Sequence, residues 1–144
     1  MGEFGVAQVS EGFAAVLEED AASPVVSAYV FGSVADDRAH RESDVDVAVL
    51  LRHETAPTSA DRFEIRLRLC SRLAARLHRA VDLVVLNDAP PGLGRHVVTR
   101  GVRVLVRDLE ADHAFVRDVQ LRAADLDLFL RRMRRIKLEA MARP

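Results

Sequence analysis

Hydrophobic and polar residues follow two different periods along this chain, which predicts a mixture of strands and helices. Apolar runs with the length and flanking residues of β-strands occur at VVSAYVF (25–31), DVDVAVLL (44–51), VDLVVL (81–86) and VRVLV (102–106). Between these runs, apolar residues recur every three or four positions, as on one face of a helix. Because strands and helices alternate, we expect an α/β fold with a small mixed sheet of about four strands and flanking helices.

Two helices are expected in the first half of the chain. Ser10 can cap the first, which runs to about Asp20. Its inward-facing residues are Phe13, Val16 and Leu17. A short helical or irregular piece from Val34 to Arg41 precedes the second strand. The second helix spans 61–79, and the residues that we expect on its buried face are Phe63, Leu67, Cys70, Ala74 and Leu77.

Two more helices are expected in the second half. Asp88 can cap one that starts at Pro90 or Pro91 and is closed by Gly101. The last covers about 109–142, and its predicted buried stripe consists of Phe115, Val119, Leu126, Leu130, Met133 and Ile136. Three further leucines fall outside that stripe: Leu121, Leu128 and Leu138. This is more apolar surface than one buried face needs, so we expect the long C-terminal helix to dock a partner.

Length and composition limit the classes of protein that this chain can belong to. We expect 144 residues, 49% of them hydrophobic, to form a single domain over 1–144, with a core at about 25–108 and a C-terminal docking segment at about 109–142. A formal net charge of -1 argues against direct nucleic-acid binding as the main task. No apolar run has the length of a membrane span. The single cysteine, Cys70, reads as core packing in a reducing compartment, which favours a cytoplasmic protein.

Two carboxylates lie within the second strand, which must bury at least one of its faces. Asp44 and Asp46 are two residues apart, so their side chains share one face with Cα atoms about 6.5 to 7 Å apart, while Val45 and Val47 point to the core. Two carboxylates this close repel each other. Their repulsion is tolerable if both are solvated, or if a divalent cation takes their oxygens as ligands.

A Gly-Ser pair and a third acid extend this candidate site. Gly32 and Ser33 end the first strand at a turn, where the missing Cβ lets backbone N–H groups approach an anion such as a phosphate. Asp82 begins the strand 81–86, and it can close a triangle with the other acids if that strand neighbours 44–51. Three acids and a phosphate cradle are the parts of a two-metal phosphoryl-transfer site.

These residues resemble the signature of the polymerase-β-like nucleotidyltransferases. In GSVADDRAHRESDVD (32–46), Gly-Ser is followed by a spacer of about ten residues and then by Asp, an apolar residue and Asp. The short chain, the third acid and the trailing NDAPPGLGRHVVTRGVRVLVRD resemble the minimal nucleotidyltransferase (MNT) branch, which includes MntA-type antitoxins encoded beside HEPN-domain toxins. The resemblance covers about Val25 to Asp108.

The resemblance implies a nucleotidyltransferase fold and a set of roles. Asp44, Asp46 and Asp82 would bind Mg²⁺ and carry catalysis, while Gly32 and Ser33 would contact the triphosphate of ATP. The expected activity is protein adenylyltransfer to a tyrosine hydroxyl of a cognate HEPN toxin. Two alternatives stay open: an antitoxin that neutralises its partner by binding alone, and a small-molecule nucleotidyltransferase of the aminoglycoside-modifying kind.

One feature departs from the family pattern. Asp36 and Asp37 stand in the spacer where many relatives carry Arg and Gly. Two extra negative charges near an anion site would weaken its affinity for a phosphate.

Overall fold

The computed structural model describes residues 4–38 and 44–143. The elements in chain order are α1 (Val6–Glu18), β1 (Val25–Phe31), α2 (Gly32–Ala35), β2 (Val45–Leu51), α3 (Ser59–Leu77), β3 (Val81–Val85), the 3₁₀ helix η1 (Leu86–Asp88), α4 (Pro91–Arg100), β4 (Val102–Val106) and α5 (Leu109–Ala142). All four strands occur where the sequence predicts them. Of the piece expected at 34–41, residues 39–41 lie outside the described residues.

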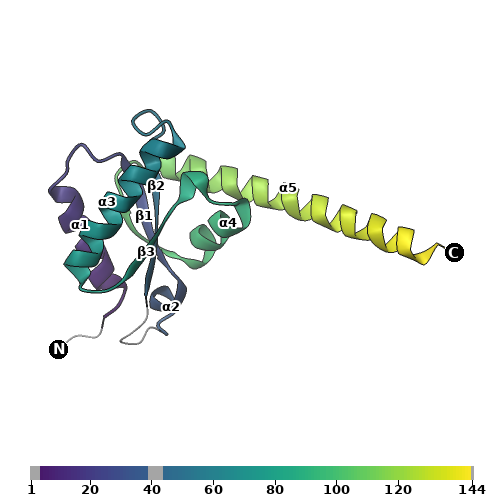
Figure 1. Cartoon of the computed structure of the whole chain (residues 1–144), viewed down its shortest axis with the longest axis horizontal. Helices are drawn as coiled ribbons and strands as arrows, with labels where there is room; N and C mark the ends of the chain where they lie inside the picture. The colour runs from purple at the N-terminus through teal and green to yellow at the C-terminus, as the bar shows by residue number, and fades with distance from the viewer. Residues whose placement is uncertain (1–3, 39–43, 144) are drawn as a thin grey trace.

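The four strands form one mixed sheet in the order β3-β2-β1-β4. β2 runs parallel to β3, and β1 runs antiparallel to both β2 and β4. Helices α1 and α3 cover one face of the sheet, and α4 with the first part of α5 covers the other (Figure 1). The predicted α/β class, the mixed sheet and the long C-terminal helix are therefore confirmed.

Strand β2 lies inside the sheet and is covered on both faces. Its odd-numbered valines pack on the side of α1 and α3, while Ala48 and Leu50 pack on the side of α4. A strand with two buried faces needs a nearly continuous apolar run, which VAVLL provides. Asp46 is the one residue within β2 that is not buried.

The first helix starts earlier than predicted. Gly5 is its N-cap, with the Gln8 side chain accepting from the Gly5 N–H at 2.8 Å, so α1 begins at Val6 rather than at a capping Ser10. Ser10 lies inside the helix, where its hydroxyl donates to the Val104 carbonyl of β4 at 3.1 Å. The predicted inward-facing residues Phe13, Val16 and Leu17 are buried, and the hydrophobic core therefore extends to residues that precede β1.

The predicted buried face of α3 is partly wrong. Phe63 and Leu67 are 54% and 53% exposed, whereas Leu69 and Leu73 are buried. The helix carries two apolar stripes at helical spacing, and a periodicity alone does not tell which stripe faces the sheet. Cys70 is partly buried, as expected, and its Sγ donates to the Val81 carbonyl at 3.1 Å.

Asp88 does not cap α4. Its carboxylate instead pairs with Arg62 of α3 at 2.8 Å, and Pro90 is the N-cap residue, with Pro91 starting the helix. Gly101 follows the end of α4 as predicted.

The stripe predicted as core in α5 is buried only near the body of the protein. Val119 and Ala123 are buried, but Leu126, Leu130, Met133 and Ile136 are exposed. The reason is that α5 has 34 residues and its second half projects beyond the sheet, with no described element beneath it (Figure 1). Asp127 pairs with Arg95 of α4 at 2.7 Å. Neither α5 nor any other helix of the described residues is apolar enough to span a bilayer.

A buried carboxylate fixes the start of α5 to the sheet. Asp112 is fully buried and accepts hydrogen bonds from Ser27 and Tyr29 of β1, each at 2.6 Å, and from Arg103 of β4 at 2.9 Å. Burial, together with the hydrogen bond to Asp112, raises the pKa of the Tyr29 hydroxyl, so this group stays protonated and donates. The hydrophobic pattern did not predict this network because Asp112 lies at an apparently polar position.

We expect Asp112→Ala to destabilise the fold by about 3–5 kcal/mol, because it leaves two hydroxyls and a guanidinium without their buried acceptor. Urea unfolding followed by circular dichroism measures this change. Asp118→Ala is the matched control on the same helix, since Asp118 forms only an exposed pair with Arg122 and should cost less than about 0.5 kcal/mol. Equal effects of the two substitutions would contradict a structural role for the Asp112 network.

Candidate active site

The sheet brings two of the three predicted acids together. In the parallel pairing of β2 and β3, Asp46 is the register partner of Asp82, so the two residues lie side by side on the face of α4. Neighbouring strands are about 4.8 Å apart, which places the two carboxylates within reach of one cation. Asp44 lies just before β2 and is exposed, as is Asp82. The condition for bringing Asp82 to the other acids, that its strand lies beside β2, is met.

The electrostatic environment of Asp46 is unfavourable for a negative charge. Partial burial raises the pKa of this carboxyl, and the neighbouring Asp82 and Asp44 carboxylates raise it further. All the charged groups responsible for the shift are acids. A group of carboxylates that repel one another gains most from a bound cation, so the site has the chemistry of a divalent metal site.

Gly32 lies directly against the Asp46 carboxylate. Phe31 is the register partner of Asp46, so the chain leaves β1 at this point and α2 begins beside the acid. Gly32 has φ +71°, and a Cβ at this position would collide with Asp46 Oδ2. Only glycine combines this backbone angle with this close approach.

The first turn of α2 offers N–H groups that have no partner within the helix. Such groups at a helix start bind anions, and here they belong to Gly32, Ser33 and the residue after them. The two acids of the spacer do not leave this turn with two uncompensated charges, because Asp36 pairs with Arg38 at 2.9 Å. The predicted phosphate contact by Gly32 and Ser33 therefore fits the local backbone and remains a prediction.

The donor set fits Mg²⁺ in chemistry, although the ligands are not gathered in advance. Within residues 4–38 and 44–143, no three His, Cys, Asp or Glu side chains are clustered as a preformed metal site. Asp44 and Asp82 are exposed, so their side chains are free to rotate toward a cation beside Asp46.

One aromatic contact next to the acids was not predicted. His96 of α4 meets the Phe31 ring edge-on, with ring centroids 6.4 Å apart. Phe31 is the register partner of Asp46, so this pair borders the site on the side of β1. No periodicity in the sequence relates His96 to Phe31, because the contact depends on how α4 crosses the sheet.

Comparison with known proteins agrees with this arrangement of a mixed sheet, a glycine against an acid and paired acids on neighbouring strands. The model of the family described as polymerase beta, nucleotidyltransferase, matches residues 15–110. The chain has a nucleotidyltransferase fold and belongs to the polymerase β nucleotidyltransferase family.

Individual proteins similar to this chain narrow the comparison further, to a protein adenylyltransferase and to toxin–antitoxin complexes. The protein adenylyltransferase MntA of Shewanella oneidensis is 41% identical over 73 residues, which is 51% of this chain and 48% of that relative. The chain thus matches about half the length of this curated relative. A crystal structure of a toxin–antitoxin with AMP-PNP superimposes with a TM-score of 0.67 and 26% identity, over 92% of this chain and 98% of that chain. A structure of tri-AMPylated Shewanella oneidensis HEPN toxin with MNT antitoxin gives a TM-score of 0.60 and 25% identity, over 94% and 98%.

The raised pKa of Asp46 predicts how stability depends on pH. The Asp46 carboxyl stays protonated to a higher pH in the folded protein than in the unfolded chain. Its contribution therefore lowers the free energy of unfolding as the pH rises from 3.8, the ordinary pKa of an aspartate, through the raised pKa of the folded state. Asp46→Asn should remove this cost, and its melting temperature at pH 7 should equal or exceed that of the unsubstituted chain. Added Mg²⁺ should raise the melting temperature of the unsubstituted chain and not that of Asp46→Asn.

Thermal melts between pH 3.5 and 7, with and without Mg²⁺, measure both effects. Glu64→Gln serves as the control, because Glu64 is an exposed carboxylate on α3 away from the acids. A lower melting temperature for Asp46→Asn at pH 7 would mean that Asp46 stabilises the fold and is not a strained site residue.

Proposed function

We propose that this chain is a Mg²⁺-dependent nucleotidyltransferase that transfers AMP from ATP to a tyrosine hydroxyl of a HEPN toxin and so acts as an antitoxin in the cytoplasm. The observation that carries the proposal is the register of Asp46 with Asp82, with Gly32 packed against the Asp46 carboxylate. The names of its relatives, a protein adenylyltransferase and an MNT antitoxin in complex with an AMPylated HEPN toxin, support the choice of reaction and partner.

Each candidate residue has a distinct task in this reaction. Asp44 and Asp46 would hold the Mg²⁺ that accompanies the triphosphate, while the N–H groups of Gly32 and Ser33 would donate to phosphate oxygens. Mg²⁺ held by the three acids would offset their repulsion and polarise the phosphoryl group. Asp82 accepts the proton of the acceptor hydroxyl. The tyrosine oxygen forms a bond to the α-phosphorus, the bond from that phosphorus to the bridging oxygen breaks, and pyrophosphate leaves.

The projecting half of α5 is the proposed docking surface for the toxin. Leu121, Leu128 and Leu130 are 67%, 61% and 50% exposed. Leu130 follows Val119 and Ala123 on the face that packs against the body, whereas Leu121 and Leu128 lie on the opposite face of the helix, so a partner finds apolar anchors on two faces of this surface. Basic side chains surround it at Arg131, Arg132, Arg134 and Arg135, and such a charged rim steers association with an acidic partner surface.

We expect the unsubstituted chain to transfer AMP to a HEPN protein from the same genome in the presence of ATP and Mg²⁺. Asp44→Asn together with Asp46→Asn should reduce the yield by at least about a thousandfold, because the cation loses two ligands. Asp82→Ala should lower kcat far more than it weakens ATP binding, since its contribution is made to the attacking oxygen. Intact-mass spectrometry of the acceptor and calorimetry with ATP measure these quantities.

The same assay separates the alternatives. Neutralisation of the toxin by the double mutant, without AMP transfer by any form of the chain, would establish the antitoxin that acts by binding alone. Transfer to aminoglycosides in place of the HEPN protein would establish the small-molecule enzyme.

The docking proposal has its own test. Leu128→Ser with Leu130→Ser should weaken binding to the HEPN protein by about tenfold or more, because anchoring apolar side chains carry most of the binding energy of an interface. The melting temperature should fall by no more than a few degrees, since exposed side chains contribute little to the fold. Leu109→Ser is the control, because Leu109 is 49% exposed but lies at the start of α5. Unchanged binding by the double mutant would place the docking surface elsewhere.

A further inference from the structure

A groove opens along the free edge of the sheet and begins at Asp82. Within residues 4–38 and 44–143, β3 is an edge strand whose one neighbour is β2. The groove has a volume of about 390 Å³ and follows β3 from Asp82 to Val85, continuing to Asp88 and Pro90. Phe63 of α3 and Leu93 of α4 line it from opposite faces of the sheet. The groove therefore leads from solvent to one of the proposed catalytic acids.

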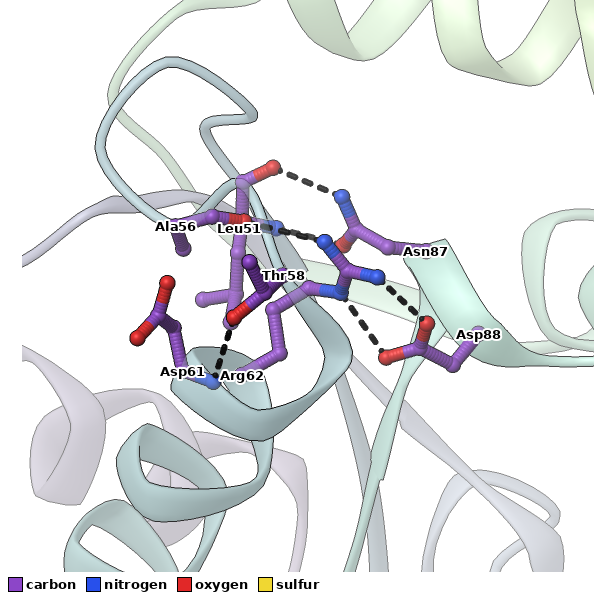
Figure 2. A network of polar contacts seen from close by, with 7 residues as sticks. All are labelled: Leu51, Ala56, Thr58, Asp61, Arg62, Asn87 and Asp88. Atoms are coloured by element: carbon purple, nitrogen blue, oxygen red, sulfur yellow. Dashed lines mark hydrogen bonds and ion pairs between the residues drawn. The ribbon is translucent and has the colours of Figure 1, made fainter.

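The end of the groove away from Asp82 is held rigidly. Arg62 of α3 forms a bidentate pair with Asp88, at 2.9 and 2.8 Å, and donates to the Ala56 carbonyl at 3.0 Å. Asn87 bonds both the N–H and the carbonyl of Leu51 at 2.9 Å. Figure 2 shows these bonds joining the start of α3, the end of β2 and η1. These bonds join α3 to η1, and η1 to the end of β2, at this end of the groove.

The direction of the reaction assigns this groove to the acceptor. In phosphoryl transfer, the attacking oxygen and the leaving oxygen lie in line on opposite sides of the phosphorus. Gly32 and Ser33, at the end of β1, lie on one side of Asp46, and Asp82 lies on the other, because the strand order is β3-β2-β1. With the triphosphate on the side of β1, the attacking hydroxyl must enter from the side of β3.

The chemistry of the groove fits an extended polypeptide segment. The outer edge of a terminal strand presents backbone N–H and carbonyl groups that an added strand can pair with. Apolar side chains on both walls suit an aromatic residue next to that strand, and Phe63 is more than half exposed with its ring on the wall. We propose that this groove binds the segment of the acceptor protein that carries the modified hydroxyl, and presents that hydroxyl to Asp82. This assignment rests on the proposed function.

Two exposed apolar side chains on α3 provide a matched test. Phe63 and Leu67 are equally exposed, but only Phe63 lines the groove. We expect Phe63→Ser to lower kcat/KM for the HEPN protein by about tenfold, with ATP binding unchanged, because it removes an apolar contact made only by the acceptor. Leu67→Ser should change neither value.

A second pair of variants fills the groove in place of enlarging it. Ser59→Trp adds a large side chain to the groove wall, whereas Ala60→Trp adds it at an exposed neighbour that does not line the groove. Only Ser59→Trp should lower kcat/KM for the HEPN protein. This pair decides the question if Phe63→Ser lowers the melting temperature by more than Leu67→Ser does.

The outcomes separate the groove from the proposed function. Transfer that is equally affected within each pair overturns the groove assignment and leaves the reaction intact. Loss of ATP affinity in Phe63→Ser or Ser59→Trp would mean that the groove binds the nucleotide, and it would also overturn the acceptor assignment. Absence of transfer by the unsubstituted chain refutes the proposed function, and the acceptor assignment with it.

Discussion

The buried carboxylate of Asp112 determines how the C-terminal helix leaves the body. Its three donors come from β1 and β4, so the start of α5 is bonded to two neighbouring strands at once. Without these donors, a charge at this fully buried position would cost several kcal/mol. Because the anchor holds the first turns of α5 in one orientation, the rest of this 34-residue helix is directed away from the sheet with its apolar residues uncovered. The proposed docking surface is therefore a consequence of the fold.

The candidate active site depends in the same way on strand pairing. Val45 and Val47 are fully buried, and their packing fixes which face of β2 carries Asp46. A shift of the β2–β3 register by one residue would turn Asp82 to the other face, so the hydrophobic core and the acid pair are specified together. This coupling allows a strained group of carboxylates to persist, since the apolar strand around it supplies the stability.

Much of this arrangement could be predicted from the sequence, and the exceptions have physical causes. Strand positions follow from apolar runs, and Asp46 beside Asp82 follows once β2 and β3 are neighbours. Local pattern did not predict that Phe63 would be exposed, because α3 has two apolar stripes and its orientation is decided by tertiary packing. It also did not predict the Asp112 network, since three donors distant in sequence make that burial possible. Leu130 is exposed because the helix extends past the sheet at this point, and the spacing of apolar residues in the sequence does not show where the sheet ends.

Strand β3, at the edge of the sheet, must avoid unwanted pairing with other chains and still leave Asp82 accessible. A free strand edge invites pairing with other chains, and proteins usually shorten or cover such edges. Here β3 has only five residues, and side chains of α3 and α4 flank it on the two faces of the sheet. This leaves little room for a second sheet to pair along β3. The Arg62–Asp88 pair holds this narrow opening in shape. What remains accessible is the groove that ends at Asp82, and this access is what the proposed transfer to a protein hydroxyl would need.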